Sequence, residues 1–177
     1  MKYLHTPPDW KPTWCKLSNG WWFLPINCNG STAVRDHRIS AFLPEPEGTC
    51  TVAVIRNPID RLYNVWTSPE WQQRWPDLER LVNHICTYPD LEAHIRPQYR
   101  SVEHLMPRLL IDFDNIKAGF DSITPPLGYE PLELDWKPHI RAQYREVKGG
   151  PDDPFTDDML DRIQDIYQQD FELWADL

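Results

Sequence analysis

The sequence Thr-Val-Ala-Val-Ile-Arg-Asn-Pro-Ile-Asp-Arg-Leu-Tyr-Asn-Val-Trp occupies residues 51–66 and organises the rest of the chain. Residues 51–55 are an apolar, β-branched run, which predicts a buried parallel strand. Pro58 suits the first position of a helix, because its φ is fixed and its missing N–H costs nothing there. Arg56 is therefore expected at the carboxyl end of a strand and beside a helix N-terminus, where α/β sheets bind anions. The alternative is that Arg56 pairs with a nearby carboxylate.

A second polar turn precedes this unit in the chain. The apolar run at 21–26 predicts a strand, residues 27–32 form a small polar loop, and residues 33–42 are expected to be helical. A strand, a small polar loop and a helix together build a phosphate cradle, because backbone N–H groups and the helix N-terminus face the anion. The loop lacks the Gly-Lys-Ser/Thr of a Walker motif, so an ordinary turn is the alternative.

The remaining pattern alternates helical and extended segments around these two units. Helices are expected at 68–75, 78–88, 116–123 and 156–174, a strand at 109–114, a loop at 93–99, and irregular Pro-rich chain at 124–138. Residues 1–20 are expected to be an extended lead-in pinned by aromatic contacts. We expect one α/β domain over residues 1–177.

Composition narrows the classes of function. The 177 residues carry a net charge of −9, which disfavours nucleic acid as a partner of the whole surface. The four cysteines show no Cys-x-x-Cys spacing, which is typical of reduced thiols. We see no signal peptide and no apolar run near the roughly 20 residues that span a bilayer, so we expect a cytoplasmic protein without a membrane partner. The histidines lack a tight ligand spacing, so no metal is expected.

Residues 54–66, Val-Ile-Arg-Asn-Pro-Ile-Asp-Arg-Leu-Tyr-Asn-Val-Trp, also resemble a known motif. They are similar to the 3′-phosphate-binding segment of sulfotransferases that use 3′-phosphoadenosine 5′-phosphosulfate (PAPS), above all the carbohydrate (Golgi-type) branch. The resemblance implies that Arg56 and Asn64 bind the 3′-phosphate, with Asn64 standing where the family has Ser. An Asn amide can still donate a hydrogen bond to phosphate. The resemblance further implies a P-loop-like three-layer fold with a short central parallel sheet flanked by helices.

The polar loop resembles the end of the family's 5′-phosphosulfate loop. The residues that this implies as nucleotide ligands are Cys28, Asn29, Gly30, Ser31 and Thr32. The family's Lys, which steadies the bridging oxygen as sulfate leaves, is replaced by Ile26, Asn27 or Cys28, depending on the gap. Candidate substitutes for this cation are Lys16, Arg35 and Arg96.

Two further segments resemble the family. His94, Pro97 and Gln98 match a His-Trp-x-Pro-Gln segment, with Ile95 in place of Trp, although a loop His is commonly just a surface residue. A late segment containing Arg141 and Lys148 faintly resembles the loop that closes over the nucleotide; the alternative is a solvated basic turn. The end of the last helix, 166–174, resembles the family's closing helix, and its apolar stripe indicates packing.

The resemblance implies transfer of a sulfuryl group from PAPS to a hydroxyl of a small molecule or glycan, and a sugar is the expected acceptor. For the base that takes the hydroxyl proton, the candidates are His37, His94 and Asp36, and His37 is favoured. The first alternative is a degenerate nucleotide-binding or partner-binding protein, which the missing Lys favours. The second is a P-loop phosphotransferase, against which the absent Gly-Lys-Ser/Thr argues. The sequence leaves the oligomeric state open.

Overall fold

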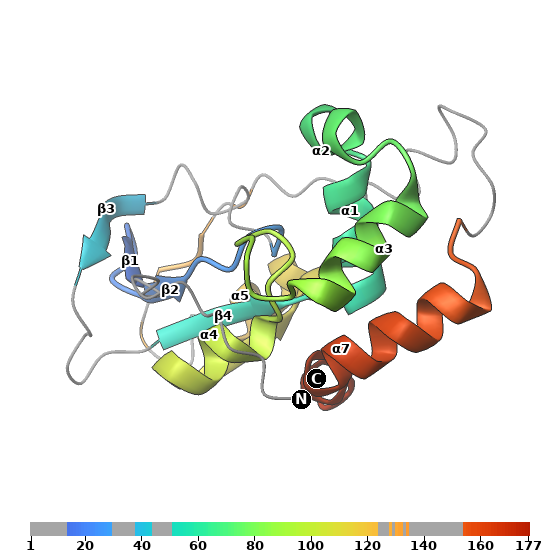
Figure 1. Cartoon of the computed structure of the whole chain (residues 1–177). Helices are drawn as coiled ribbons and strands as arrows, with labels where there is room; N and C mark the ends of the chain where they lie inside the picture. The colour runs from blue at the N-terminus through green and yellow to red at the C-terminus, as the bar shows by residue number, and fades with distance from the viewer. Residues whose placement is uncertain are drawn as a thin grey trace.

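The structure is a computed structural model, and it describes residues 14–29, 38–43, 51–123, 128, 130–132, 134 and 154–177. In the described part of the chain, a run of strands comes first, a run of helices follows, and one further strand lies among the later helical segments (Figure 1). In chain order they are β1 (Trp14–Leu17), β2 (Trp22–Leu24), β3 (Arg38–Leu43), β4 (Thr51–Ile55), α1 (Pro58–Trp66), α2 (Pro69–Arg74), α3 (Leu78–Thr87), α4 (Gln98–Leu105), β5 (Leu109–Asp112), the 3₁₀ turn η2 (Phe113–Asn115), α5 (Ile116–Ile123) and α7 (Asp157–Ala175).

The strands form one five-stranded sheet with the order β3-β1-β2-β4-β5. The pairs β2–β4 and β4–β5 are parallel, which confirms the parallel part of the expected sheet. β1 runs antiparallel to both β2 and β3, so the complete sheet is mixed and the expectation of a parallel sheet is wrong at that edge. The physical reason is the short connection from β1 to β2, closed by Gly20 at a φ of 92°, since a tight turn joins strands only in antiparallel fashion.

Residues 38–43 are a strand, so the helix expected over 33–42 is wrong for this part. β3 pairs with β1 in an irregular antiparallel ladder, in which Cys15 lies opposite Ala41 and Lys16 opposite Ser40. The local pattern missed this because strand formation here depends on a partner more than 20 residues earlier in the chain. β1 itself lies within the expected lead-in, which is therefore part of the sheet from Trp14 onward.

Helices cover both faces of the parallel strands. On β4, Val52 and Val54 pack into a core cluster with α5, whereas Ala53 and Ile55 pack into a second cluster with α4 and the end of α7. This alternation follows from the two-residue period of a strand. The described part of the chain is thus an α/β structure in which a mixed sheet lies between helical layers.

A third core cluster lies beyond the carboxyl end of β4, among α1, α2, α3 and α7. Figure 1 shows these four helices together on one side of the molecule, with β1 and β3 on the opposite side. Leu62, Leu81 and Ile163 are fully or almost fully buried in this cluster. The expected helices at 68–75, 78–88, 116–123 and 156–174 are confirmed within one residue at each end, and α5 matches at both ends.

Helix α4 is an element that the sequence pattern did not indicate. Its N-cap is Pro97, whose side chain cannot cap, and no side chain of its own segment satisfies the first N–H groups. Asp170 on α7 supplies that cap, by accepting hydrogen bonds from the backbone N–H groups of Gln98 and Tyr99, both at 2.8 Å. In the described residues, none of the helices is both long and apolar enough to cross a bilayer.

Candidate functional site

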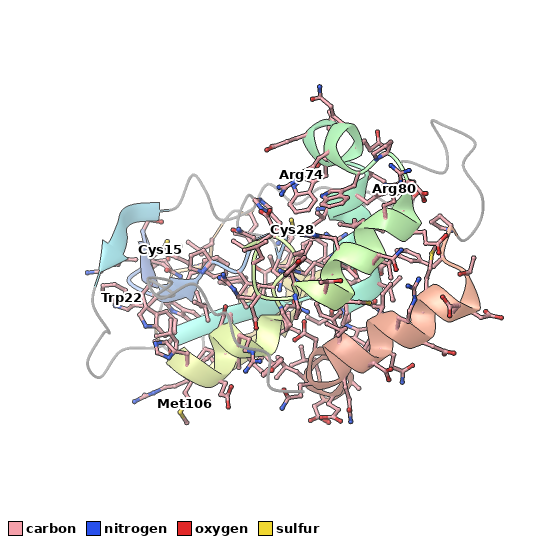
Figure 2. The ribbon with its side chains drawn as sticks, viewed as in Figure 1. Cys15, Trp22, Cys28, Arg74, Arg80 and Met106 are labelled. Carbon is pink, nitrogen blue, oxygen red and sulfur yellow. The ribbon has the colours of Figure 1, made fainter. Side chains whose placement is uncertain are left out.

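The carboxyl ends of β2, β4 and β5 meet at one edge of the sheet, because these three neighbouring strands are parallel. Cys28 and Asn29 follow β2, Arg56 follows β4, and Phe113 follows β5. Figure 2 shows Cys28 between the strands and helices α1 and α3, and the residue is partly buried. The two turns that the sequence assigns to phosphate binding therefore open at the same edge, as far as Asn29 on the first of them.

Arg56 is buried at this edge, with an exposed fraction of only 2%. Its Nη1 donates a hydrogen bond of 3.2 Å to the Cys28 carbonyl, and the guanidinium lies 4.2 Å from the centre of the Phe113 ring. Its Nε and Nη2 are buried and have no hydrogen-bond partner in the part of the chain that the structure describes. Two unsatisfied donors on a buried cation are costly, and a ligand that accepts hydrogen bonds would remove that cost.

The pKa of the Arg56 guanidinium reflects its buried position. Burial lowers the pKa of the Arg56 guanidinium to about 10, and the charges of Asp60 and Asp114 oppose this decrease. Neither carboxylate accepts a hydrogen bond from Nε or Nη2. Among the described residues, Nε and Nη2 therefore take part in no hydrogen-bonded ion pair.

Cys28 has a backbone conformation that is unusual for a residue with a Cβ. Its φ of 66° lies in the left-handed region, which costs a non-glycine residue of order 1 kcal/mol or more. This conformation accompanies the hydrogen bond from Arg56 to the Cys28 carbonyl. Strain of this kind persists where the surrounding contacts over-determine the backbone, and it is common at binding sites.

Gln98 connects the two turns. Its side-chain Oε1 accepts from the Arg56 N–H at 3.0 Å, and its Nε2 donates to the Arg56 carbonyl at 2.8 Å. The same Oε1 also accepts from Nδ2 of Asn29, which donates in addition to the Val54 carbonyl at 2.8 Å. Asn29 and Gln98 are completely buried, so these bonds fix the end of β4 against the turn that follows β2.

Asp170 lies behind Gln98 and is also completely buried. Its Oδ2 accepts from the Gln98 backbone N–H and, at 3.3 Å, from the Gln98 side-chain Nε2. Burial raises the pKa of the Asp170 carboxyl, while Arg61 and the donors on Gln98 and Tyr99 act in the opposite direction. A carboxylate at the N-terminus of α4 also interacts favourably with the helix dipole.

Arg61 is a second buried arginine, but its contacts differ from those of Arg56. Its Nε donates to the Asn27 carbonyl at 3.1 Å and its Nη1 to the Arg96 carbonyl at 2.9 Å. Arg61 therefore fastens the turn after β2 and the segment before α4 to helix α1. This role is structural, because these nitrogens already have partners.

The remaining described candidates are placed less centrally. Asn64 lies on α1, and its buried Oδ1 has no hydrogen-bond partner within the described ranges. His94 is exposed, and its ring packs edge-on against Trp71 at 5.8 Å. No hydrogen bond joins His94 to Arg56 among the described residues.

Several sequence candidates lie outside the described residues. They are Gly30, Ser31, Thr32, Asp36, His37, Arg141 and Lys148, and Arg35 among the substitute cations. Of the two described substitutes, Lys16 lies 6.0 Å from the ring of Trp22, opposite the start of β2 and not its carboxyl end. Arg96 donates from Nη2 to the Asp90 carbonyl at 2.9 Å. Neither of these contacts is with the turn after β2.

Sequence reasoning missed three residues of this edge, namely Arg61, Phe113 and Asp170, and it gave Gln98 no role. Asp170 carries a usable signal: it lies three residues after Tyr167 and seven after Ile163, on the buried stripe of α7. An acidic residue on an apolar stripe indicates a buried partner. Phe113 has no such signal, because its contact with Arg56 depends on the order of the strands.

Comparison with known proteins adds no family. A scan against protein-family models, a search of curated proteins and a search of solved structures each found no match. Within the described ranges, no group of three or more His, Cys, Asp or Glu side chains could bind a metal ion.

Proposed function

We propose that the chain is a PAPS-dependent sulfotransferase of the P-loop-like kind, which transfers a sulfuryl group to a hydroxyl, with a carbohydrate as the acceptor class. The observation that carries the proposal is the buried Arg56 guanidinium, whose Nε and Nη2 lack partners in the described residues, beside the turn after β2. A 3′-phosphate offers the accepting oxygens that these nitrogens lack. It would reach them by displacing the atoms that now cover the guanidinium.

Sulfuryl transfer requires donors that fix the nucleotide, a base for the acceptor proton and cations that offset the charge on the leaving phosphate, and the described edge supports the first of these. Arg56 would bind and orient the nucleotide. Asn64, on the helix α1 that follows Arg56, would be a further donor. The turn that begins at Asn27 would bind the other phosphate through its backbone. PAPS brings the reactive sulfuryl group: as the acceptor oxygen bonds to sulfur, the bond to the 5′-phosphate oxygen breaks. The base candidates for the acceptor proton are His37, His94 and Asp36.

A second candidate is a nucleotide-binding protein without transferase activity. The positions where the resembled family has its Lys are Ile26, Asn27 and Cys28, and Ile26 is buried in the core. Lys16 lies opposite the start of β2, and the hydrogen bond of Arg96 is to the Asp90 carbonyl, so neither contact is with the turn that would hold that charge. Losing such a charge costs a few kcal/mol of transition-state stabilisation, so an unreplaced Lys favours binding without turnover.

Two measurements separate these candidates. Calorimetry with adenosine 3′,5′-bisphosphate, and with ATP as the comparison ligand, tests the nucleotide site: we expect binding of the bisphosphate, and binding of ATP alone would refute both candidates. Transfer of labelled sulfate from PAPS to a panel of sugars then separates enzyme from binding protein. Single variants His37→Ala, His94→Ala and Asp36→Ala test the base, and unchanged turnover in all three would place it elsewhere.

A further inference from the structure

The side-chain amide of Gln98 pairs with the backbone of Arg56 as a neighbouring strand would. It accepts from the Arg56 N–H at 3.0 Å and donates to the Arg56 carbonyl at 2.8 Å. Arg56 is the first residue after β4, where the ladder with β5 has ended at Ile55 and Asp112. One buried side chain thus extends the pairing of β4 by one residue and determines the direction in which Arg56 leaves the sheet.

The same amide also controls the turn after β2. Nδ2 of Asn29 donates both to Gln98 Oε1 and to the Val54 carbonyl, so one amide nitrogen joins this turn to α4 and to β4. The Cys28 carbonyl, one residue earlier, accepts from Arg56 Nη1. The position of one turn therefore depends on the other, and Gln98 is the residue bonded to both.

Asp170 reinforces the orientation of the Gln98 amide. A side-chain amide can be placed in either of two flipped orientations, and only one of them matches both the N–H and the carbonyl of Arg56. Oδ2 of Asp170 accepts from Gln98 Nε2 at 3.3 Å, and a carboxylate can only accept, so this bond favours the orientation in which Nε2 also donates to the Arg56 carbonyl and Oε1 accepts from Arg56 and Asn29. Asp170 also fixes the backbone of Gln98 and Tyr99 at the start of α4.

We propose that Gln98 is a positioning residue of the nucleotide site, oriented by Asp170, and that it sets the place of the Arg56 guanidinium relative to the turn after β2. The inference deepens the proposed function and rests on it for the identity of the ligand. Gln98 and Asp170 act on nucleotide binding only through Arg56 and Asn29. We call the hydrogen bonds of Gln98 to Arg56, Asn29 and Asp170 the clamp. Loss of the clamp should weaken recognition of the phosphate that Arg56 binds, and leave the other nucleotide contacts in place.

The test compares two nucleotides on one variant. Gln98→Met keeps the length of the side chain and removes both its donor and its acceptor. We expect its affinity for adenosine 3′,5′-bisphosphate to fall at least about tenfold, and its affinity for adenosine 5′-monophosphate to change less than about twofold. Gln164→Met, an exposed position on α7, is the matched control and should change neither affinity. Equal losses for both nucleotides, or no loss for either, would overturn the inference.

A second readout does not depend on any ligand. The Phe113 ring, 4.2 Å from the Arg56 guanidinium, should shift the Arg56 Hε resonance in the NMR spectrum. We expect this ring-current shift to decrease in Gln98→Met, and in Asp170→Asn if the first variant fails to fold, but not in the exposed control Asp165→Asn. An unchanged Arg56 resonance in both clamp variants would refute the positioning role. If the wild type did not bind the bisphosphate, the proposed function would fail, and this resonance would still decide whether Gln98 positions Arg56.

Discussion

Replacing Arg56 with Met separates a binding arginine from a structural one. Burial lowers the pKa of Arg56 to about 10, which corresponds to roughly 3 kcal/mol against the charged form in the fold. The substitution also removes the contact with the Phe113 ring, worth about 0.5–2 kcal/mol, and the hydrogen bond to Cys28, worth about 1 kcal/mol. These contributions nearly cancel, so we expect the free energy of unfolding of nucleotide-free Arg56→Met to lie within about 1 kcal/mol of the wild-type value.

The same substitution should abolish recognition of the 3′-phosphate. Two charge-assisted hydrogen bonds from Nε and Nη2, at about 1.5–3 kcal/mol each, amount to a loss of roughly 10²- to 10⁴-fold in affinity for adenosine 3′,5′-bisphosphate. Arg61→Met is the matched control, because its Nε and Nη1 already bond to the Asn27 and Arg96 carbonyls. We expect that control to lose about 2–4 kcal/mol of stability, since two buried carbonyls lose their donors.

Urea denaturation and calorimetry on the three proteins measure both quantities. A drop of about 3–5 kcal/mol in Arg56→Met would show that Arg56 is half of a buried ion pair within the fold. Such a drop, together with unchanged affinity for the bisphosphate, would refute the reasoning.

Three further predictions concern the surroundings of this edge. The first is the variant Asp170→Asn. Because burial raises the pKa of the native carboxyl, the folded wild type loses stability as the pH rises above 3.8, the ordinary pKa of the group. In urea denaturation, the free energy of unfolding of the variant should therefore fall below the wild-type value by less at pH 7 than at pH 4, and a difference that grows with pH would contradict this. Asn64→Ser should keep bisphosphate affinity within a few-fold in calorimetry while Asn64→Ala loses about tenfold, because only Ser retains a donor; equal affinities would remove Asn64 from the site. Gly119→Ala should lower the midpoint of thermal unfolding and reduce the free energy of unfolding by about 1–3 kcal/mol, because the new Cβ would collide with the buried Ile111 side chain. An increase of about 1 kcal/mol in the free energy of unfolding, as helix propensity alone predicts, would show that α5 can move away from β5.

The elements with a strong local signal could be predicted from the sequence. The apolar run before Arg56 formed β4, Pro58 began α1, and Thr156 caps α7 through a hydrogen bond to the Met159 N–H. In each case the pattern and the cap lie within the same segment, so no distant partner was needed. The position of Arg56 at the carboxyl end of a buried strand followed from this part of the prediction.

What could not be predicted depends on contacts between distant segments. β3 forms against β1, and α4 is capped by Asp170, 72 residues after Gln98. No local periodicity reports such partners. The clamp on Arg56 was missed for the same reason, because its bonds join the turn after β2, the end of β4, the start of α4 and the last helix.

The most direct test of the central claim is a crystal structure of the protein with adenosine 3′,5′-bisphosphate. The account predicts that oxygens of the 3′-phosphate lie within about 3 Å of Nε and Nη2 of Arg56, with the other phosphate at the turn after β2. A nucleotide bound elsewhere, or a guanidinium that meets no phosphate oxygen at this edge, would contradict it.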